Sequence, residues 1–416
     1  MHREFTKNRQ YYKFSLYGFF KNLRFFEAFL MLFFLSKGLD YWQIGLIYTV
    51  REVTRNIFEI PSGVFSDSIG RRSSLAFSFG LYIASYLVFY FSESYGIILT
   101  AMFLFAMGDA LRSGTNKAMI YSYLDHKGWS KDKAAYYGGT RSWSQTGYAL
   151  SALGGAAFIW FSGNYTILFL ASVIPAFTDM LLILSYPRKM ERSPEAKQET
   201  SVLKAFRSTF MLLWKQMGKL QFWHNTNLVA LHSGYYKAVK DYLQPIMASL
   251  AISIPLLSSR SEVQREALWV GVFYFIIYSL SSIASRNSGR FSDWIQKPAK
   301  ALSISMYTGL FLGAAGGIFA WLGMTGVSVG LLTGIFLVEN IRKPIGVGNI
   351  ADSTHAGSWT SVLSLESQTA SLYGALMAPL IGIFADINGP GFGLAMMSGI
   401  AILFSVLLDL LNKQKN

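Results

Sequence analysis

The chain contains no cysteine, and few of its residues carry a charge. Without cysteine, a disulfide framework, a thiolate-ligated zinc site and a catalytic thiol are all excluded for its 416 residues. Only 14% of the residues are charged, against about 25% in an average soluble domain. The GxxxxGK[ST] phosphate loop and the HExxH metal motif are absent as well. ATP-driven chemistry is therefore not indicated, and we expect no metal and no cofactor.

The chain is rich instead in long apolar segments. Apolar residues make up 52% of the sequence, and apolar runs of roughly 20 residues recur from one end to the other. A helix of that length crosses the ~30 Å hydrocarbon core of a bilayer. The alternation of about ten residues that transmembrane strands require is missing. The composition therefore predicts an all-α, polytopic membrane protein.

Twelve transmembrane helices are predicted from these runs. They are expected near residues 16–36, 43–66, 74–92, 96–122, 135–161, 164–186, 223–251, 267–287, 300–323, 326–348, 359–386 and 391–411. Residues 1–187 would form an N-terminal six-helix bundle and residues 222–416 a C-terminal one. Between them, residues 188–221 would form a cytoplasmic linker, whose second part has the apolar and basic spacing of an amphipathic helix. A solvated linker with a short helix remains the alternative.

The net charge of +14 is spread over the connections between these helices. Lysine and arginine gather in alternate connections, whereas the opposite set offers only Lys37, Arg260 and Arg265. This is the positive-inside pattern of membrane proteins, so nucleic acid is not an expected partner. Both termini are predicted to lie in the cytoplasm of a bacterium, and the first helix is expected to remain rather than be cleaved as a signal.

Three short matches relate the two predicted bundles. In chain order they are Ser62–Asp67 with Ser288–Asp293, Asp109–Arg112 with Glu339–Arg342, and Ser144–Thr146 with Ser367–Thr369. The matches keep one order and nearly one offset, so the halves are predicted to be repeats. Parallel repeats of this kind place a substrate site near the midplane, between the halves.

The segment Gly63-x-x-x-Asp67-x-x-Gly70-Arg71-Arg72 resembles the loop signature of the major facilitator superfamily. Span count, orientation, linker and repeat extend the resemblance over nearly the whole chain. It implies two pseudo-symmetric six-helix bundles, alternating access and a monomer. It also implies a cytoplasmic conformational latch, formed by Gly63, Asp67, Gly70, Arg71, Arg72, Arg112 and Asp293. The alternative is that Arg71 and Arg72 only set the topology.

Ionisable residues also fall inside the predicted helices, where they are costly and usually functional. They concentrate in helices that the resemblance places around a central cavity. Eight residues are expected to bind the substrate: Arg24, Arg55, Arg141, Gln145, His232, Tyr236, Lys237 and Gln368. The cations among them would suit an anionic or zwitterionic organic solute. His232 could also titrate near neutrality, but a lone membrane histidine is more often a packed hydrogen-bonding group.

Three carboxyl groups, Glu27, Asp109 and Glu366, are candidates for proton coupling. Burial disfavours the charged form of a carboxyl group, so such a group can bind and release a proton at physiological pH. Pairing within one helix, as between Asp109 and Arg112 three residues later, is the simpler alternative.

These observations predict a secondary active transporter and not an enzyme. It would move a small organic solute by alternating access across the cytoplasmic membrane, and proton coupling is expected. A proton-independent facilitator and a translocase or exporter of an amphipathic, lipid-like substrate are the alternatives. No motif specifies the solute.

Overall fold

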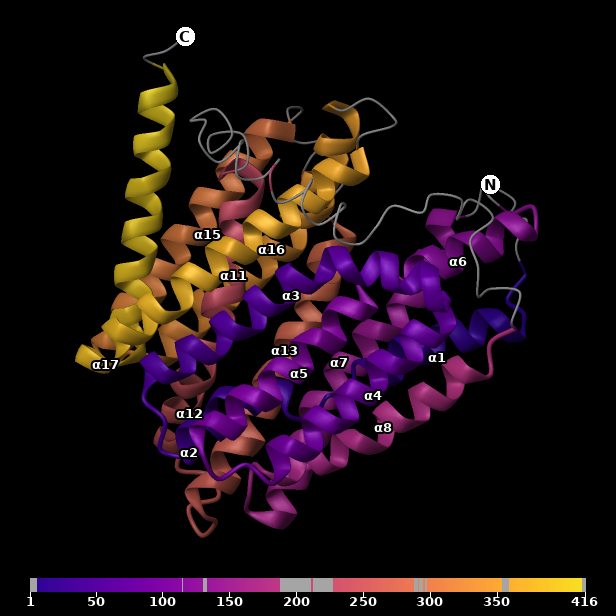
Figure 1. Cartoon of the computed structure of the whole chain (residues 1–416). Helices are drawn as coiled ribbons and strands as arrows, with labels where there is room; N and C mark the ends of the chain where they lie inside the picture. Colours follow the sequence, from indigo (N-terminus) through magenta and orange to yellow (C-terminus); the bar gives the residue numbers. More distant parts are fainter. Residues whose placement is uncertain are drawn as a thin grey trace. The chain divides into compact units, whose positions relative to one another are not determined.

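The computed structural model describes residues 6–113, 115–129, 133–187, 211, 227–287, 291, 295, 298–353 and 359–413. Within these residues all regular secondary structure is helical and no strand occurs (Figure 1). The predicted all-α fold is therefore confirmed. Six of the helices are long and apolar enough to cross a membrane by length and composition. The number of twelve spans stays a prediction.

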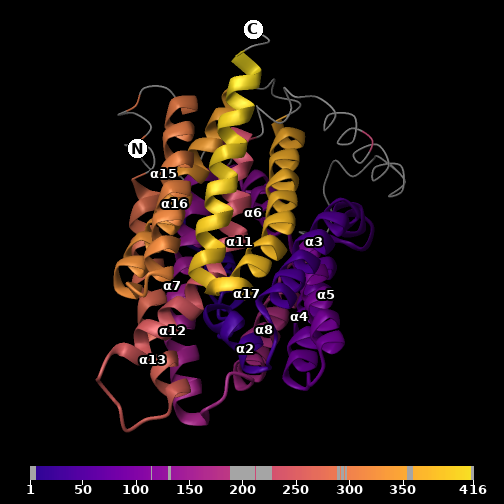
Figure 2. The same ribbon diagram turned by 90° about the vertical axis from the view of Figure 1, so that its left-hand side faces the viewer.

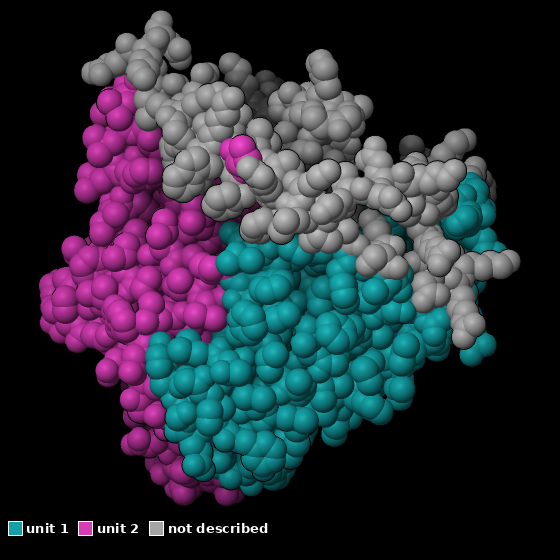
Figure 3. All heavy atoms as spheres, in the orientation of Figure 1, with its two compact units in different colours: residues 1–28, 54–209 teal, residues 29–53, 210–416 magenta. Residues whose placement is uncertain are grey.

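The chain divides into two compact units, which Figure 3 colours separately. Unit 1 comprises residues 1–28 and 54–209, and unit 2 comprises residues 29–53 and 210–416. The division falls inside helix α3 (Tyr41–Ile69), so residues 29–53 group with the second unit. The predicted linker lies outside the described residues, except for Met211, and the predicted domain boundaries stay a prediction.

Unit 1 contains most of the N-terminal helices. They are α1 (Arg9–Lys21), the second part of α3, α4 (Arg71–Tyr90), α5 (Tyr95–Arg112), α6 (Thr115–His126), α7 (Lys133–Ser162) and α8 (Ile167–Leu184). Helix α8 packs against α4 through aromatic rings: Phe169 stacks on Phe89, with ring centroids 4.7 Å apart. Phe169 also stacks on Phe26, at 4.9 Å, so one ring holds three segments of the unit together.

Unit 2 contains the first part of α3 and the helices of the C-terminal half. They are α2 (Leu30–Ser36), the π-helical turn η4 (Asn227–Leu231), α11 (His232–Val239), the 3-10 turn η5 (Lys240–Tyr242), α12 (Leu243–Ser253), α13 (Glu262–Arg286), α15 (Pro298–Trp321), α16 (Thr325–Ser353) and α17 (Trp359–Lys413). A 3-10 turn, η1 (Glu27–Phe29), spans the boundary along the chain between residues 28 and 29, where unit 2 begins.

Five predicted spans differ from single straight helices. The first is split into α1 and α2 around residues 22–26, and the fourth into α5 and α6. The seventh is a series of a π turn, α11, a 3-10 turn and α12. The last two run together as α17, which has non-helical backbone at Asn388 and Gly389. Gly389 has φ +85°, a conformation in which a Cβ is strained, so a glycine sits where the chain turns from one span to the next.

Helix α15 packs closely on α16 and α17 within unit 2 (Figure 2). The Ser328 hydroxyl of α16 donates a hydrogen bond to the carbonyl of Gly316 at 2.7 Å. On the α17 side, a Cβ at Gly317 would lie 2.7 Å from the carbonyl oxygen of Gly391 and 2.5 Å from the amide nitrogen of Ala395. Small residues let helix backbones approach this closely in membrane proteins.

Substitution of Gly317 tests this contact. The atoms that an added methyl would meet belong to the backbone of α17, so they cannot rotate away. We expect Gly317→Ala to destabilise the protein by about 1–3 kcal/mol and to lower its thermal unfolding temperature in detergent. Gly330→Ala, on α16, is the matched control, because its Cβ would meet no heavy atom within 4 Å. Equal unfolding temperatures for the two variants would contradict the packing.

Candidate functional site

A buried network in unit 1 centres on Asp109 of α5. Arg24 Nη2 lies 3.2 Å and Arg112 Nη2 lies 3.1 Å from Asp109 Oδ1. Tyr82 of α4 donates a hydrogen bond to the same oxygen, and Arg112 Nε donates to the Tyr82 hydroxyl at 2.9 Å. The guanidinium carbon of Arg24 also lies 4.5 Å from the Tyr82 ring centroid and 4.8 Å from that of Phe105. Two arginines thus share one carboxylate.

This network joins residues for which the sequence suggested three different roles. Arg24 was expected to bind substrate, Asp109 to carry protons and Arg112 to belong to the latch. The local pairing of Asp109 with Arg112 is present, as the simpler alternative proposed. Two further candidates act on the network electrostatically, Arg55 on Asp109 and Glu27 on Arg24. The structure therefore brings five candidates together in unit 1, while their roles stay predictions.

A second network lies in unit 2, around Lys237 of α11. Its Nζ lies 3.2 Å from Glu52 Oε2 of α3 and donates a hydrogen bond to Ser371 Oγ of α17 at 2.7 Å. The Glu52 side chain is 5% exposed and the Lys237 side chain 21% exposed. Lys237 therefore connects three helices, and its side chain is more exposed than that of Glu52.

Further ion pairs continue from Glu52. Arg51 Nε lies 3.4 Å from Glu52 Oε1, and Arg51 Nη1 lies 3.7 Å from Asp241 Oδ2. Lys240 Nζ lies 2.8 Å from Asp241 Oδ1. Lys237, Arg51 and Lys240 thus share the two carboxylates of Glu52 and Asp241. The sequence analysis found Lys237 but not its partners, because they come from distant parts of the chain.

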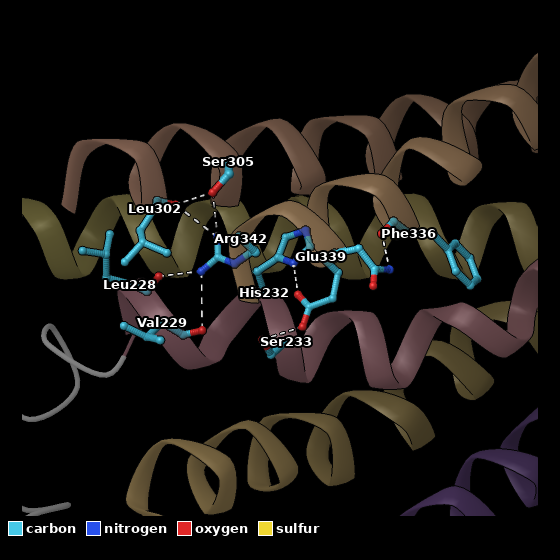
Figure 4. Close-up of polar contacts among 10 residues, drawn as sticks. Leu228, Val229, His232, Ser233, Leu302, Ser305, Phe336, Glu339 and Arg342 are labelled. Carbon is cyan, nitrogen blue, oxygen red and sulfur yellow. Dashed lines mark hydrogen bonds and ion pairs between the residues drawn. The ribbon is translucent and has the colours of Figure 1, made fainter. Parts of the chain in front are cut away.

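A third polar group of unit 2 pairs His232 of α11 with Glu339 of α16 (Figure 4). The distance from His232 Nδ1 to Glu339 Oε2 is 2.9 Å. Ser233 Oγ donates to the other carboxylate oxygen, Oε1, at 2.8 Å. His232 is completely buried, and Glu339 is nearly so. The histidine is therefore a hydrogen-bonded partner of a carboxylate, and Glu339 is a buried acid that the list of expected site residues lacked.

Arg342 lies one turn after Glu339 on α16 and is 1% exposed. Its Nη2 donates to the carbonyls of Leu228, at 2.6 Å, and of Val229, at 3.4 Å (Figure 4). Its Nη1 donates to the carbonyl of Leu302, at 3.1 Å, and to Ser305 Oγ, at 3.3 Å. Leu228 and Val229 belong to the π turn η4. One guanidinium group therefore joins the start of the seventh predicted span to α15 and α16.

The remaining candidates are placed only in part. Tyr236 packs edge-on against Phe336 with centroids 5.2 Å apart, Gln368 is buried and Gln145 is half-buried. Among the latch residues, Gly63 is exposed, Gly70 has φ +95° before α4, and Arg71 and Arg72 are half-buried. The side chains of Arg141, Glu366, Asp67 and Asp293 lie outside the described residues. The latch and these site assignments stay predictions.

Asp179 of α8 is a buried acid that the sequence analysis did not select. It is 0% exposed, and neither carboxyl oxygen has a hydrogen-bond partner among the described residues. Lys21 and Arg112 are its electrostatic neighbours. Its signal in the sequence was the single charge within an otherwise apolar span. No cluster of three or more metal-ligating side chains occurs in the described part of the chain.

Known proteins resemble this chain in sequence and in fold. The family model for the Major Facilitator Superfamily matches residues 19–365. The uncharacterized MFS-type transporter YxaM of Bacillus subtilis (strain 168) is 41% identical over 90 residues, which cover 22% of this chain and 23% of that protein. The match therefore spans less than a quarter of that relative's length.

Solved transporter structures share the fold over nearly the whole chain. A mutant of the nucleoside transporter NupG has a TM-score of 0.76 at 11% identity, covering 96% of this chain and 99% of that one. A POT family transporter in complex with 5-aminolevulinic acid has a TM-score of 0.64 at 14% identity, covering 97% and 95%. Identities this low show similarity of fold alone.

The contacts of Arg342 yield a prediction about stability. Arg342→Ala removes the partner of two π-turn carbonyls and the cation nearest Glu339, so we expect a loss of about 3–5 kcal/mol. Arg342→Lys should recover only part of it, because a lysine cannot donate in two directions from a planar group. Lys343→Ala, which removes the exposed neighbour, is the control. Thermal unfolding in detergent measures all three, and full stability of Arg342→Lys would contradict this role.

Proposed function

The chain belongs to the major facilitator superfamily, and from that premise we propose that it moves a small organic solute with an anionic or zwitterionic character by alternating access, coupled to protons. The family makes the chain a membrane transporter and not an enzyme. The charge of the solute, its coupling and its path across the bacterial cytoplasmic membrane are the proposal, as are cytoplasmic termini and a monomeric state.

The observation that carries the proposal is the network around Lys237. Charges inside membrane-spanning helices are expensive, and they pair with one another or mark the path of a substrate. Lys237 is the more exposed member of its pair with Glu52, and Lys237, Arg51 and Lys240 share the carboxylates of Glu52 and Asp241. A negatively charged group on the solute would compete with Glu52 for the ammonium group.

The network of unit 1 supports the same class of solute. Arg24 and Arg112 share the single carboxylate of Asp109, and Arg24 lies against two aromatic rings. A guanidinium group can bind a carboxylate through two parallel hydrogen bonds. Each unit therefore has its own cationic group that could bind the anionic part of a solute.

A ligand screen tests the proposed solute class. We expect at least one member of a panel of nucleosides, amino acids, dipeptides and small carboxylates to raise the unfolding temperature of the purified protein at two pH values. A ligand present at 100 times its dissociation constant stabilises the folded state by about 2.7 kcal/mol. Lys237→Ala should lose that shift, because the ammonium group binds the ligand.

The control for this screen is Lys300→Ala, which alters an exposed lysine at the start of α15. It should keep the full ligand-induced shift. A ligand-induced rise in unfolding temperature that is equal in Lys237→Ala and in the wild-type protein would show that Lys237 does not bind the ligand. A shift by neutral, amphipathic lipids alone, together with flipping of a labelled phospholipid in proteoliposomes, would support the lipid translocase instead.

Proton coupling is tested with the ligand from that screen, radiolabelled, in proteoliposomes. Glu27→Gln and Glu366→Gln are expected to abolish accumulation driven by an imposed pH gradient while preserving exchange, because neither amide can carry a proton. Glu93→Gln alters an exposed glutamate and is the control. If both variants still accumulate the ligand, the coupling assignment is wrong. If the wild-type protein never accumulates it, the protein is a facilitator.

A further inference from the structure

The pair of His232 and Glu339 is closed off from its surroundings. Nδ1 of His232 faces the carboxylate, whereas Nε2 is buried and has no hydrogen-bond partner among the described residues. Nε2 points at Gly309 of α15, where the Cβ of any other residue would overlap the imidazole. Glycine at this position therefore makes room for the ring, and the contact leaves no place for water at Nε2.

The charges around the pair balance only when the histidine is neutral. Glu339 and Arg342 carry opposite charges one turn apart on α16, and they act on His232 together. Lys343, also on α16, acts on Glu339 from an exposed position. The nearest ring on α11 is that of Tyr235, with its centroid 6.2 Å from that of the imidazole. A proton added to His232 would leave one uncompensated positive charge in a buried place.

The other helices around the pair add no carboxylate in their described side chains that could compensate this charge. Helix α15 presents Ser305 to Arg342 and Gly309 to the imidazole. Helix α17 packs on α11 through Tyr373, which lies against Gly234. Burying an uncompensated charge is costly. Close packing of α11 on α15 therefore disfavours protonation of His232, and protonation in turn disfavours this packing.

We propose that His232 and Glu339 form a proton-binding site in unit 2, where Nε2 accepts the proton once α11 and α15 separate at Gly309. Nδ1–H remains donated to Glu339, so the imidazole–carboxylate pair gains one proton, becomes an imidazolium–carboxylate pair, and no other bond changes. The proposal rests on the proposed proton coupling. It locates that coupling at a pair that is not among the candidates Glu27, Asp109 and Glu366.

The π turn directly before His232 is the part of the chain that would change when α11 moves away from α15. Glu339 and Arg342 lie on one face of α16, and they bind consecutive parts of one segment: His232 and the turn directly before it. π turns are rare and occur frequently at functional sites. A shift of α11 would change the contacts of both residues together, so occupancy by a proton and the conformation of the turn are linked.

Nitrogen NMR of the full-length protein, labelled with ¹⁵N-histidine and reconstituted in lipid nanodiscs, tests the site without any solute. His232→Asn identifies the signals of His232 among the five histidines. Between about pH 8 and about pH 5, His232 should change from a neutral ring with its proton on Nδ1 to the imidazolium form. Glu339→Gln should weaken proton binding by about tenfold or more. Glu339→Gln should leave the signal of the exposed His126 unchanged.

Thiol accessibility tests the separation of the helices, because the chain has no cysteine of its own. Met306→Cys places a single thiol at a position of α15 that is 1% exposed. Maleimide labelling, corrected with a Lys300→Cys variant for the effect of pH on the reagent, should be faster at the lower pH, and His232→Asn should abolish the difference.

Three outcomes would overturn the proposal: a His232 signal that stays neutral throughout, titration that is unaffected by Glu339→Gln, or labelling that is equally slow at both pH values. Because neither measurement needs a transported solute, failure here is distinct from failure of the proposed function. If His232 titrates as expected but no ligand is found, the proton-binding site stands and the proposed solute class does not.

Discussion

A charge inside an apolar helix bundle must find its partner within the protein, and this requirement organises both units. Arg24, Lys237 and Arg342 each contact a carboxylate, a hydroxyl or a backbone carbonyl of another segment. Arg24, Lys237 and Arg342 thereby join segments that hydrophobic contacts alone would hold without a fixed register. The polar contacts are few, and they determine which turn of one helix faces which turn of the next.

Much of the fold follows from the length and spacing of apolar runs. The predicted spans coincide with helices to within a few residues along most of the described chain. The errors occur where a helix breaks or changes its hydrogen-bonding pattern: around residues 22–26, between α5 and α6, and at the π turn before His232. Hydropathy reflects the free energy of transfer from water to lipid. It therefore does not reveal where the pattern of backbone hydrogen bonds changes. Between residues 386 and 391, by contrast, the predicted boundary coincides with the non-helical backbone at Asn388 and Gly389.

The candidate site was predictable where partners are close in sequence. Asp109 and Arg112 are three residues apart, and helical spacing alone puts them together. Glu52 and Lys237 are separated by 185 residues, and His232 and Glu339 by 107, so only the packing of distant helices could reveal these pairs. Single-sequence reasoning found one member of each pair through its charge at membrane depth, and it had no means of finding the other.

The two predicted repeats use the same spacing of acid and arginine in different ways. On α5 the arginine turns back to the acid three residues before it. On α16 the acid binds a histidine, while the arginine binds carbonyls of another segment. Arg342 therefore ties the turn before His232 to α15 and α16, so a rearrangement of that turn must release carbonyls of two segments at once.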